Sequence, residues 1–211
     1  FDFGINISNN EWLNIDVTYF HALYKNKIVN DNKTDEETNE KYTTYANADK
    51  GRMNGLEIMF SSDIAKAFQS RYSLELYAGV THLFNNKLDE ITAKDTPDEK
   101  KLTKDMLYVR RTTGNFGITF DTNNGFVTRL NARYIGKRLE NDWMAWDNLR
   151  PDIKPEDYYT KSDYEATNQI LQHSAHLVFD YSAHYNVTPQ ARVGISVSNL
   201  FDENYTEKDG Y

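Results

Sequence analysis

The clearest pattern in the chain is the run Tyr72-Ser73-Leu74-Glu75-Leu76-Tyr77-Ala78-Gly79-Val80-Thr81, in which mainly apolar and mainly polar positions alternate. A period of two residues is typical of a β-strand whose two faces meet different surroundings. The same period recurs along the chain. It predicts eight strands at about residues 1–8, 12–29, 42–61, 72–81, 106–121, 126–134, 174–184 and 191–198. The sequence therefore predicts an all-β fold.

The lengths of the links between these strands alternate as well. The links near residues 9–10, 63–70, 122–124 and 187–189 are short, whereas residues 30–41, 85–105 and 141–172 form long polar links. Short links at one end and long ones at the other are typical of an outer-membrane barrel. We therefore expect an antiparallel up-and-down transmembrane β-barrel segment of about eight strands, with the aliphatic faces in hydrocarbon. A short helical turn is expected within residues 96–105.

Composition narrows the class of protein. The 211 residues include no cysteine, which excludes disulfides and cysteine-based metal sites. The net charge of −8, with no basic stripe, argues against a nucleic-acid partner. No run reaches the roughly 18 apolar residues of a membrane helix. A mean hydropathy of −0.76 is compatible with a barrel, because only every second strand residue faces lipid.

The stretch Ser196-Val197-Ser198-Asn199-Leu200-Phe201-Asp202-Glu203-Asn204-Tyr205 resembles the penultimate-strand signature of TonB-dependent receptors. The residues that carry this resemblance are Asn199, Leu200, Phe201, Asp202 and Tyr205. Two shorter stretches agree with it. Asn54-Gly55-Leu56-Glu57-Ile58 resembles the Gly-x-Glu strand of these barrels, and Tyr134-Ile135-Gly136 resembles their Tyr-x-Gly ending before a long outer loop.

The resemblance implies that residues 1–211 are a partial C-terminal β-barrel domain, about eight strands of a barrel of about 22. The plug with its TonB box and the final strand would then lie outside this sequence. The implied location is the cell outer membrane of a Gram-negative-type bacterium. The implied function is TonB-dependent import of an iron complex such as a ferric siderophore. The partners would be outer-membrane lipid, the TonB complex through the plug region, and the small ligand. No cofactor and no enzymatic activity are implied.

Candidate ligand-binding residues lie near the long links. Trp143 and Trp146, with Arg138 and Arg150, offer aromatic and cationic groups for an aromatic or chelated ligand. Loop packing and the upper aromatic girdle are the competing interpretation of the aromatic residues. His82, near the outer end of its strand, is a further candidate ligand contact.

No catalytic residue and no metal site are predicted. His173 and His176 differ by three positions and would point to opposite faces of a strand. His176 and His184 would be about 27 Å apart along a strand. The loop carboxylates show no burial pattern and no regular calcium-loop spacing.

Two alternatives remain open at this point. One is a small eight-stranded outer-membrane barrel, closed on itself. The other is a soluble β-sandwich, such as a carbohydrate-binding module. The sandwich requires the Leu, Val and Ile faces to pack against a second sheet, whereas the membrane barrel requires them to face outward.

Overall fold

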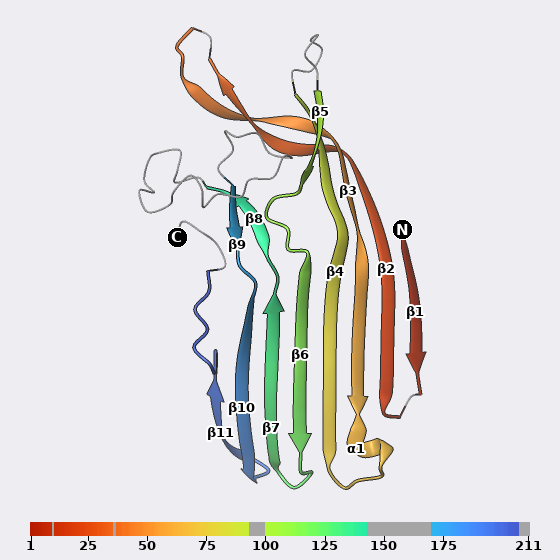
Figure 1. Ribbon diagram of the computed structural model, residues 1–211. Coiled ribbons are helices and arrows are strands. Elements are labelled where there is room, and N and C mark those ends of the chain that lie inside the picture. Colours follow the sequence, from red (N-terminus) through yellow and green to blue (C-terminus); the bar gives the residue numbers. More distant parts are fainter. Residues whose placement is uncertain (10, 36, 93–99, 143–169, 207–211) are drawn as a thin grey trace.

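The computed structural model describes residues 1–9, 11–35, 37–92, 100–142 and 170–206, and most of these residues lie in strands (Figure 1). The elements are β1 (Asp2–Ser8), β2 (Leu13–Thr34), β3 (Lys41–Asp63), α1 (Ile64–Ala67), β4 (Ser73–Thr92), β5 (Lys100–Asp105), β6 (Thr112–Asp121), β7 (Phe126–Ile135), β8 (Arg138–Asn141), β9 (Ile170–His173), β10 (His176–Thr188) and β11 (Ala191–Val197). In the described part of the chain, no helix is long and apolar enough to span a membrane.

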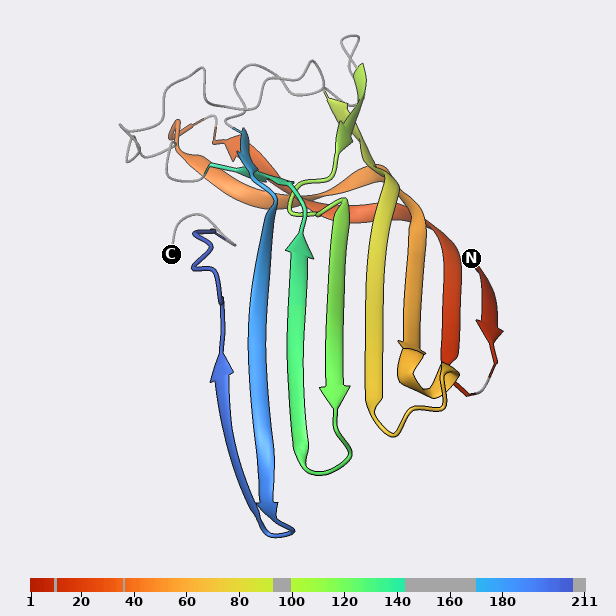
Figure 2. The ribbon, with the colours of Figure 1, turned by 60° about the horizontal axis from the view of Figure 1, so that its bottom comes forward.

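The main sheet is antiparallel and follows chain order. Its strands run β1-β2-β3-β4-β6-β7-β10-β11, while β5 pairs with the upper part of β4 and β8 pairs with β9. These eight sequential strands confirm the predicted up-and-down arrangement. Figures 1 and 2 show them side by side in one curved layer, with the short turns at the bottom and the extended segments at the top. Among the described residues β1 does not pair with β11, so the sheet is open and the closed eight-stranded barrel is not formed.

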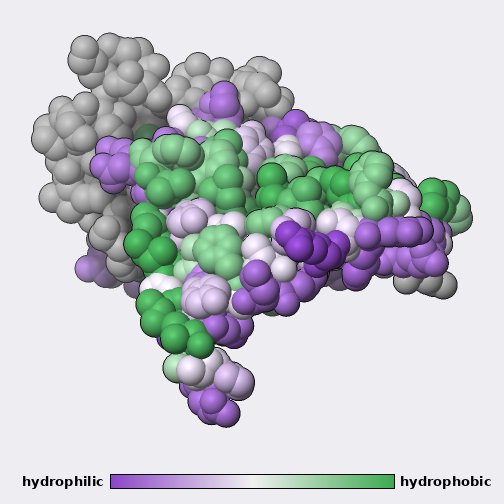
Figure 3. All heavy atoms as spheres, turned by 90° about the horizontal axis from the view of Figure 1, so that it is seen from below, coloured by the Kyte–Doolittle hydropathy of each residue, from purple (hydrophilic) through white to green (hydrophobic). Residues whose placement is uncertain are grey.

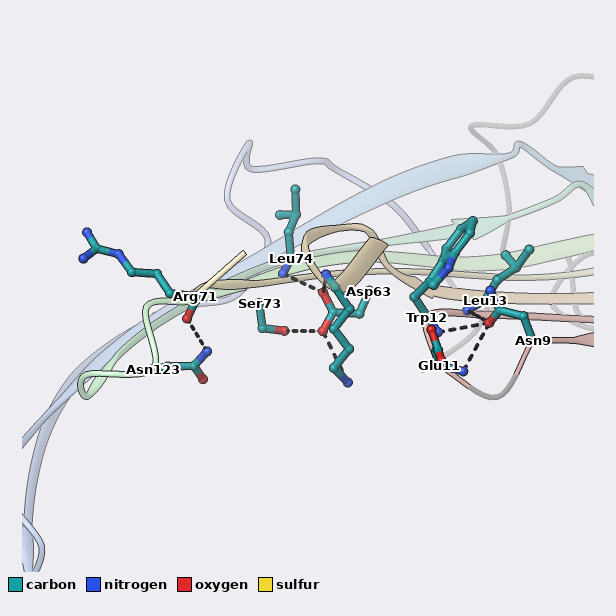
Figure 4. Close-up of polar contacts among 10 residues, drawn as sticks. Asn9, Glu11, Trp12, Leu13, Asp63, Arg71, Ser73, Leu74 and Asn123 are labelled. Atoms are coloured by element: carbon teal, nitrogen blue, oxygen red, sulfur yellow. Dashed lines mark hydrogen bonds and ion pairs between the residues drawn. The ribbon is translucent and has the colours of Figure 1, made fainter. Parts of the chain in front are cut away.

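The register gathers the aliphatic residues on one face. Val17 lies opposite Ile5 on one side and Ile58 on the other. Seen from the short turns, hydrophobic residues gather along the convex side of the sheet and hydrophilic residues along its concave side (Figure 3). Leu13 and Leu74 point to the same side in Figure 4. The alternation in the sequence therefore becomes two chemically distinct surfaces of a single wall.

No second sheet covers the convex face within the described residues. Ile118 lies in the middle of the central strand β6 and still exposes 47% of its surface, and Ile195 on β11 exposes 61%. A sandwich would bury such side chains against its second sheet. The β-sandwich alternative is therefore wrong, and the aliphatic face remains available to hydrocarbon.

The loop end holds more regular structure than we expected. β2 and β3 continue to Thr34 and from Lys41, so their link is only residues 35–40. The expected helical turn is wrong in its described part, because residues 100–105 form β5. The first four residues of the expected turn, 96–99, lie outside the described residues. Pairing with β4 satisfies the backbone of this charged stretch, whereas a helix here would have no apolar face to bury.

Glycine is required at one position in each of the two shorter family-like stretches. A Cβ on Gly55 would lie 2.3 Å from the carbonyl oxygen of His82, where the register between β3 and β4 shifts. A Cβ on Gly136 would lie 2.4 Å from the carbonyl oxygen of Thr112. Both glycines therefore permit a close backbone approach at the upper end of the wall.

Candidate functional site

The concave face carries a row of polar side chains that hydrogen-bond across strands. Arg129 Nε donates to Thr119 Oγ1 at 3.0 Å, and Tyr77 Oη donates to Asn131 Oδ1 at 3.0 Å. The second bond spans the intervening strand β6, since Gly117 lies between Tyr77 and Asn131 in the register. Satisfied polar groups of this kind suit a water-filled interior.

The segment from Met106 to Arg111 joins three elements at the loop end. Met106 N–H donates to the carbonyl of Asn86 at 2.8 Å, and the Leu83 N–H donates to the carbonyl of Arg111 at 2.7 Å. Tyr108 N–H donates to the carbonyl of Leu139 at 2.7 Å, which ties the segment to β8. The segment directly follows β5 and is hydrogen-bonded to β4 and β8, so side chains of these three strands lie close together.

A cavity of about 200 Å³ lies at this point. Its lining comprises Asn86, Asp105, Met106, Val109, Arg111, Lys137, Arg138, Leu139 and Gln172. Asn86 is 2% exposed, and within the described part of the chain its Oδ1 has no hydrogen-bond partner; the same holds for Arg138 Nε. A buried acceptor and a buried donor left open beside several cations suit a polar or anionic group.

Arg138 is held in place by a buried carboxylate. Its Nη2 lies 2.6 Å from Glu140 Oε2, and Glu140 Oε1 lies 2.8 Å from His173 Nε2 on β9. Glu140 is almost fully buried, so water screens its interaction with the arginine only weakly. This arrangement orients the guanidinium beside the cavity and links the β8–β9 pair internally.

Asp105 anchors the other side of the cavity. Its carboxylate lies 2.8 Å from Arg111 Nη2 and 3.0 Å from Lys87 Nζ. Burial raises the pKa of Asp105, but the Lys87 hydrogen bond and the Arg111 charge outweigh burial and lower the pKa below its ordinary value. The carboxylate is therefore charged at neutral pH and positions Arg111.

The sequence-predicted site residues do not all come together. Arg138 lines the cavity. His82 lies opposite Leu56, on the convex aliphatic face, with its Nδ1 2.8 Å from Thr112 Oγ1 and its ring edge-on to Phe84 at 5.3 Å. Trp143, Trp146 and Arg150 lie outside the described residues.

Sequence reasoning missed Asn86, Arg111 and Lys137. Arg111 and Lys137 lie outside the strands, where alternation no longer predicts the direction of a side chain, and Asn86 lies within β4 beyond its bulge. The register shift between Asn54 and Gly55 adds an extra residue to β4, so the parity of its upper half changes. The charge of Arg111 and Lys137 was the one signal available in the sequence.

Asn199 closes a tight turn at the end of β11. Its side chain accepts from the N–H of Glu203 at 2.9 Å and donates to the carbonyl of Glu203 at 3.0 Å. Its own N–H donates to Asp180 Oδ1 at 2.9 Å. Asn199 and Asp202 both adopt left-handed backbone, with φ of 51° and 53°. Asn and Asp adopt this conformation more readily than most residues, which explains their places in the signature.

The remaining signature residues attach this turn to β10. Leu200 N–H donates to the carbonyl of Phe179 at 2.7 Å, and the Phe201 ring meets the Phe179 ring edge-on at 5.1 Å. The Tyr205 ring stacks on His176 at 4.3 Å. The signature thus has a structural role in the wall. His176 is engaged there, and no group of three metal-ligating side chains occurs among the described residues.

The short turns at the opposite end are closed by side chains that bind backbone (Figure 4). Asn9 Oδ1 accepts from the N–H groups of residues 11, 12 and 13 at 3.2, 3.1 and 2.9 Å. Asp63 caps α1 by accepting from Lys66 N–H, and it also accepts from Leu74 N–H and Ser73 Oγ. Such caps hold this end in one conformation.

Residues 1–200 match the family model described as TonB dependent receptor-like, beta-barrel. No curated protein matches the sequence. Similar solved structures include a variant of the ferric enterobactin receptor PfeA from Pseudomonas aeruginosa, at 19% identity and a TM-score of 0.58, over 96% of this chain and 25% of that chain. The copper transporter OprC matches at 14% identity and a TM-score of 0.61, over 97% of this chain and 26% of that chain. The ferric-catecholate import receptor Fiu from K12 E. coli matches at 17% identity and a TM-score of 0.58, over 98% of this chain and 23% of that chain. The chain thus spans about a quarter of the length of these structures.

Proposed function

This chain belongs to the TonB-dependent receptor-like β-barrel family, and on that premise we propose that the protein imports an iron complex, such as a ferric siderophore, across the outer membrane. The observation that supports this most is the single curved sheet with an uncovered aliphatic convex face and a polar concave face. Hydrocarbon on one side and water on the other are the surroundings that such a wall requires.

In this proposal the chain supplies part of the wall of a larger barrel. The cavity beside Arg111, Lys137 and Arg138 contributes to ligand binding, together with Trp143, Trp146 and Arg150 of the long link. Arg111, Lys137 and Arg138 line the cavity, where Asp105 pairs with Arg111 and Glu140 pairs with Arg138, so Lys137 adds a positive charge. An anionic metal chelate therefore fits it better than a cation does. Binding, not covalent chemistry, is the role of these residues.

The TonB complex is the proposed energy source, acting through a plug domain inside the barrel. Outer-membrane lipid is the proposed partner of the convex face. The similar solved structures include a ferric enterobactin receptor, a ferric-catecholate import receptor and a copper transporter, so the ligand must be determined directly.

The test is uptake by the full-length receptor that carries this chain. We expect cells that express it to accumulate ⁵⁵Fe from at least one ferric siderophore of a panel, and to lose this uptake when TonB is deleted. Copper uptake in place of iron uptake would contradict the proposed ligand. Uptake that persists without TonB would contradict the mechanism.

The ligand-contact residues are tested separately by binding. We expect alanine at Arg138, Trp143, Trp146 and Arg150 to weaken binding of the transported complex at least about tenfold, because charge and stacking are lost together. Alanine at Arg192, which lies at the short-turn end, is the matched control. Unchanged affinity in the fourfold variant would refute the assignment.

A further inference from the structure

The charged side chains of the concave face are divided between the two halves of the wall. Asp16, Glu57 and Glu75 lie on β2, β3 and β4, whose segments 13–24, 53–63 and 73–86 contain no lysine or arginine. Arg129 and Arg133 lie on β7, on the far side of β6. Because alternate residues and cross-strand partners share a face, the register places all five on the concave side. One half of this face is therefore acidic and the other basic.

The two arginines of β7 present guanidinium groups to the barrel interior. Both side chains are exposed, and no ion pair joins either of them to a carboxylate within the described residues. Arg129 donates through Nε to the neutral oxygen Thr119 Oγ1 at 3.0 Å, which orients the side chain. In the described part of the chain its two Nη groups have no partner. A guanidinium held in this way is suited to bind an anionic oxygen.

The carboxylates of the basic half are already hydrogen-bonded to backbone. Asp180 on β10 accepts from the N–H of Asn199 at 2.9 Å, and Asp121 at the end of β6 accepts from the N–H of Asn123 at 2.7 Å. Arg192 on β11 adds a further positive charge to the same face. The β7–β11 half therefore remains positive, although the net charge of the whole chain is −8.

The basic half adjoins the cavity at the loop end. Lys137 lines that cavity and follows Arg133 by four positions, as Arg133 follows Arg129. Four residues of an extended chain span about 14 Å. Cationic groups therefore recur at regular intervals from the cavity down β7 towards the short turns.

A second cavity, of about 570 Å³, lies at the short-turn ends of β1 to β4 and is unsuited to an anion. Among the described residues, its lining includes Glu11, Asp63 and Glu75 and no basic side chain. These carboxylates would repel an anionic solute. An anion that leaves the loop-end cavity is therefore attracted along β7 and repelled along β2 to β4.

We propose that Arg129 and Arg133, the arginine pair, guide an anionic iron chelate along the β7 side of the barrel interior, from the loop-end cavity towards the short-turn end. A cleft lined by one sign of charge raises the local concentration of an oppositely charged solute by about ten- to a thousandfold. Contacts with exposed charges are weak enough for the chelate to leave again. This inference rests on the proposed function and adds to it the route and the charge of the transported complex.

The experiment measures ⁵⁵Fe uptake by cells that express the full-length receptor. One probe is ferric enterobactin, an anion in which three catecholate dianions surround Fe³⁺. The other is ferrichrome, which is uncharged because its three hydroxamates are monoanions. We expect R129Q/R133Q to lower the maximal rate of ferric enterobactin uptake about tenfold. Surface binding of this probe, measured in cells without TonB, should stay within about twofold, because the pair lies below the cavity. Any uptake of ferrichrome should not change.

The matched control is E57Q/E75Q, which removes two charges from the other half of the same face. It should take up ferric enterobactin at least as fast as the unaltered receptor. R129K/R133K keeps both positive charges and should retain uptake within about threefold. The proposal is overturned by an unchanged uptake rate in R129Q/R133Q, or by an equal loss in R129Q/R133Q and E57Q/E75Q.

Two further results distinguish this proposal from its alternatives. Entry of vancomycin through R129Q/R133Q, but not through the unaltered receptor, would show that the arginines hold the plug in place and would overturn the proposal. Uptake of ferrichrome but not of ferric enterobactin by the unaltered receptor would refute the route and leave the import of an iron complex intact. A receptor that takes up neither probe would also overturn the route, whereas the wider siderophore panel decides the import function itself.

Discussion

The two ends of the wall are stabilised in different ways. At the short-turn end, side chains such as Asn9 and Asp63 each accept several backbone N–H groups, and the turns are only a few residues long. At the loop end, strands continue above the belt and are held by ion pairs such as Arg52–Asp89 and Lys87–Asp105. The first end is fixed by local backbone contacts and the second by contacts between distant residues.

This difference matches the roles proposed for the two ends. Hydrogen bonds to backbone hold one geometry and respond little to salt, which suits an end that only has to connect strands. Ion pairs between side chains change with ligand charge, salt and pH, which suits an end that has to receive a ligand. The cavity beside Arg138 lies at this responsive end.

The largest loss of folding stability is expected from a substitution at Gly55, where the regular wall meets the loop end. Replacing Gly55 with Val places a side chain against the His82 carbonyl, at a position where even Cβ would lie 2.3 Å away. Because that atom belongs to backbone, we expect a loss of about 3 kcal/mol or more, or failure of the barrel to fold. Urea unfolding and heat-modified gel mobility of the full-length receptor measure this. Gly79→Ala is the control, since a Cβ at Gly79 meets nothing within 4 Å. Equal stability of both variants would show that the close approach is not required.

A smaller loss of folding stability is expected when the Asp63 cap at the short-turn end is removed. Asp63→Ala removes the acceptor for two backbone N–H groups and for the Ser73 hydroxyl. We expect about 2 kcal/mol of destabilisation, nearly the same in low and high salt. Unfolding at two salt concentrations provides the measurement, with Lys66→Ala as the control for the Lys66–Asp63 ion pair at 3.5 Å. A loss that disappears in high salt would mean that charge, not capping, holds this turn.

The smallest loss of folding stability is expected when the ion pairs of Asp105 at the loop end are removed, and this loss should depend on pH. The pKa of Asp105 is lowered from 3.8, so its ion pairs stabilise the folded loop end fully above that value and are lost as pH falls through the lower folded pKa. Asp105→Asn should cost about 0.5–1 kcal/mol at pH 7, because Arg111 and Lys87 are partly exposed. Hydrogen exchange of the Met106–Arg111 segment at pH 7, 5 and 3 measures this. Protection should hold between pH 7 and 5 and fall by pH 3 in the unaltered receptor. A fall already at pH 5 would assign the dependence to another group.

Much of the fold was predictable from local patterns. The alternation predicted each of the eight strands of the main sheet in order, and the link lengths placed the short turns at one end. The signature around Asn199 predicted the family, which the match over residues 1–200 confirms. Of the predicted binding residues, Arg138 lines a cavity, whereas His82 lies on the aliphatic face.

The sequence by itself determined which residues share a face, because hydropathy at every second position is a local property of each strand. Only the tertiary structure decided how far β2, β3 and β4 continue above the belt, since pairing with a neighbour satisfies polar backbone that no local pattern marks. It also decided that Lys25 faces Lys50 and that Arg52 meets Asp89. Those contacts depend on the register between strands and on one bulge, which arise from the fit of distant segments to each other.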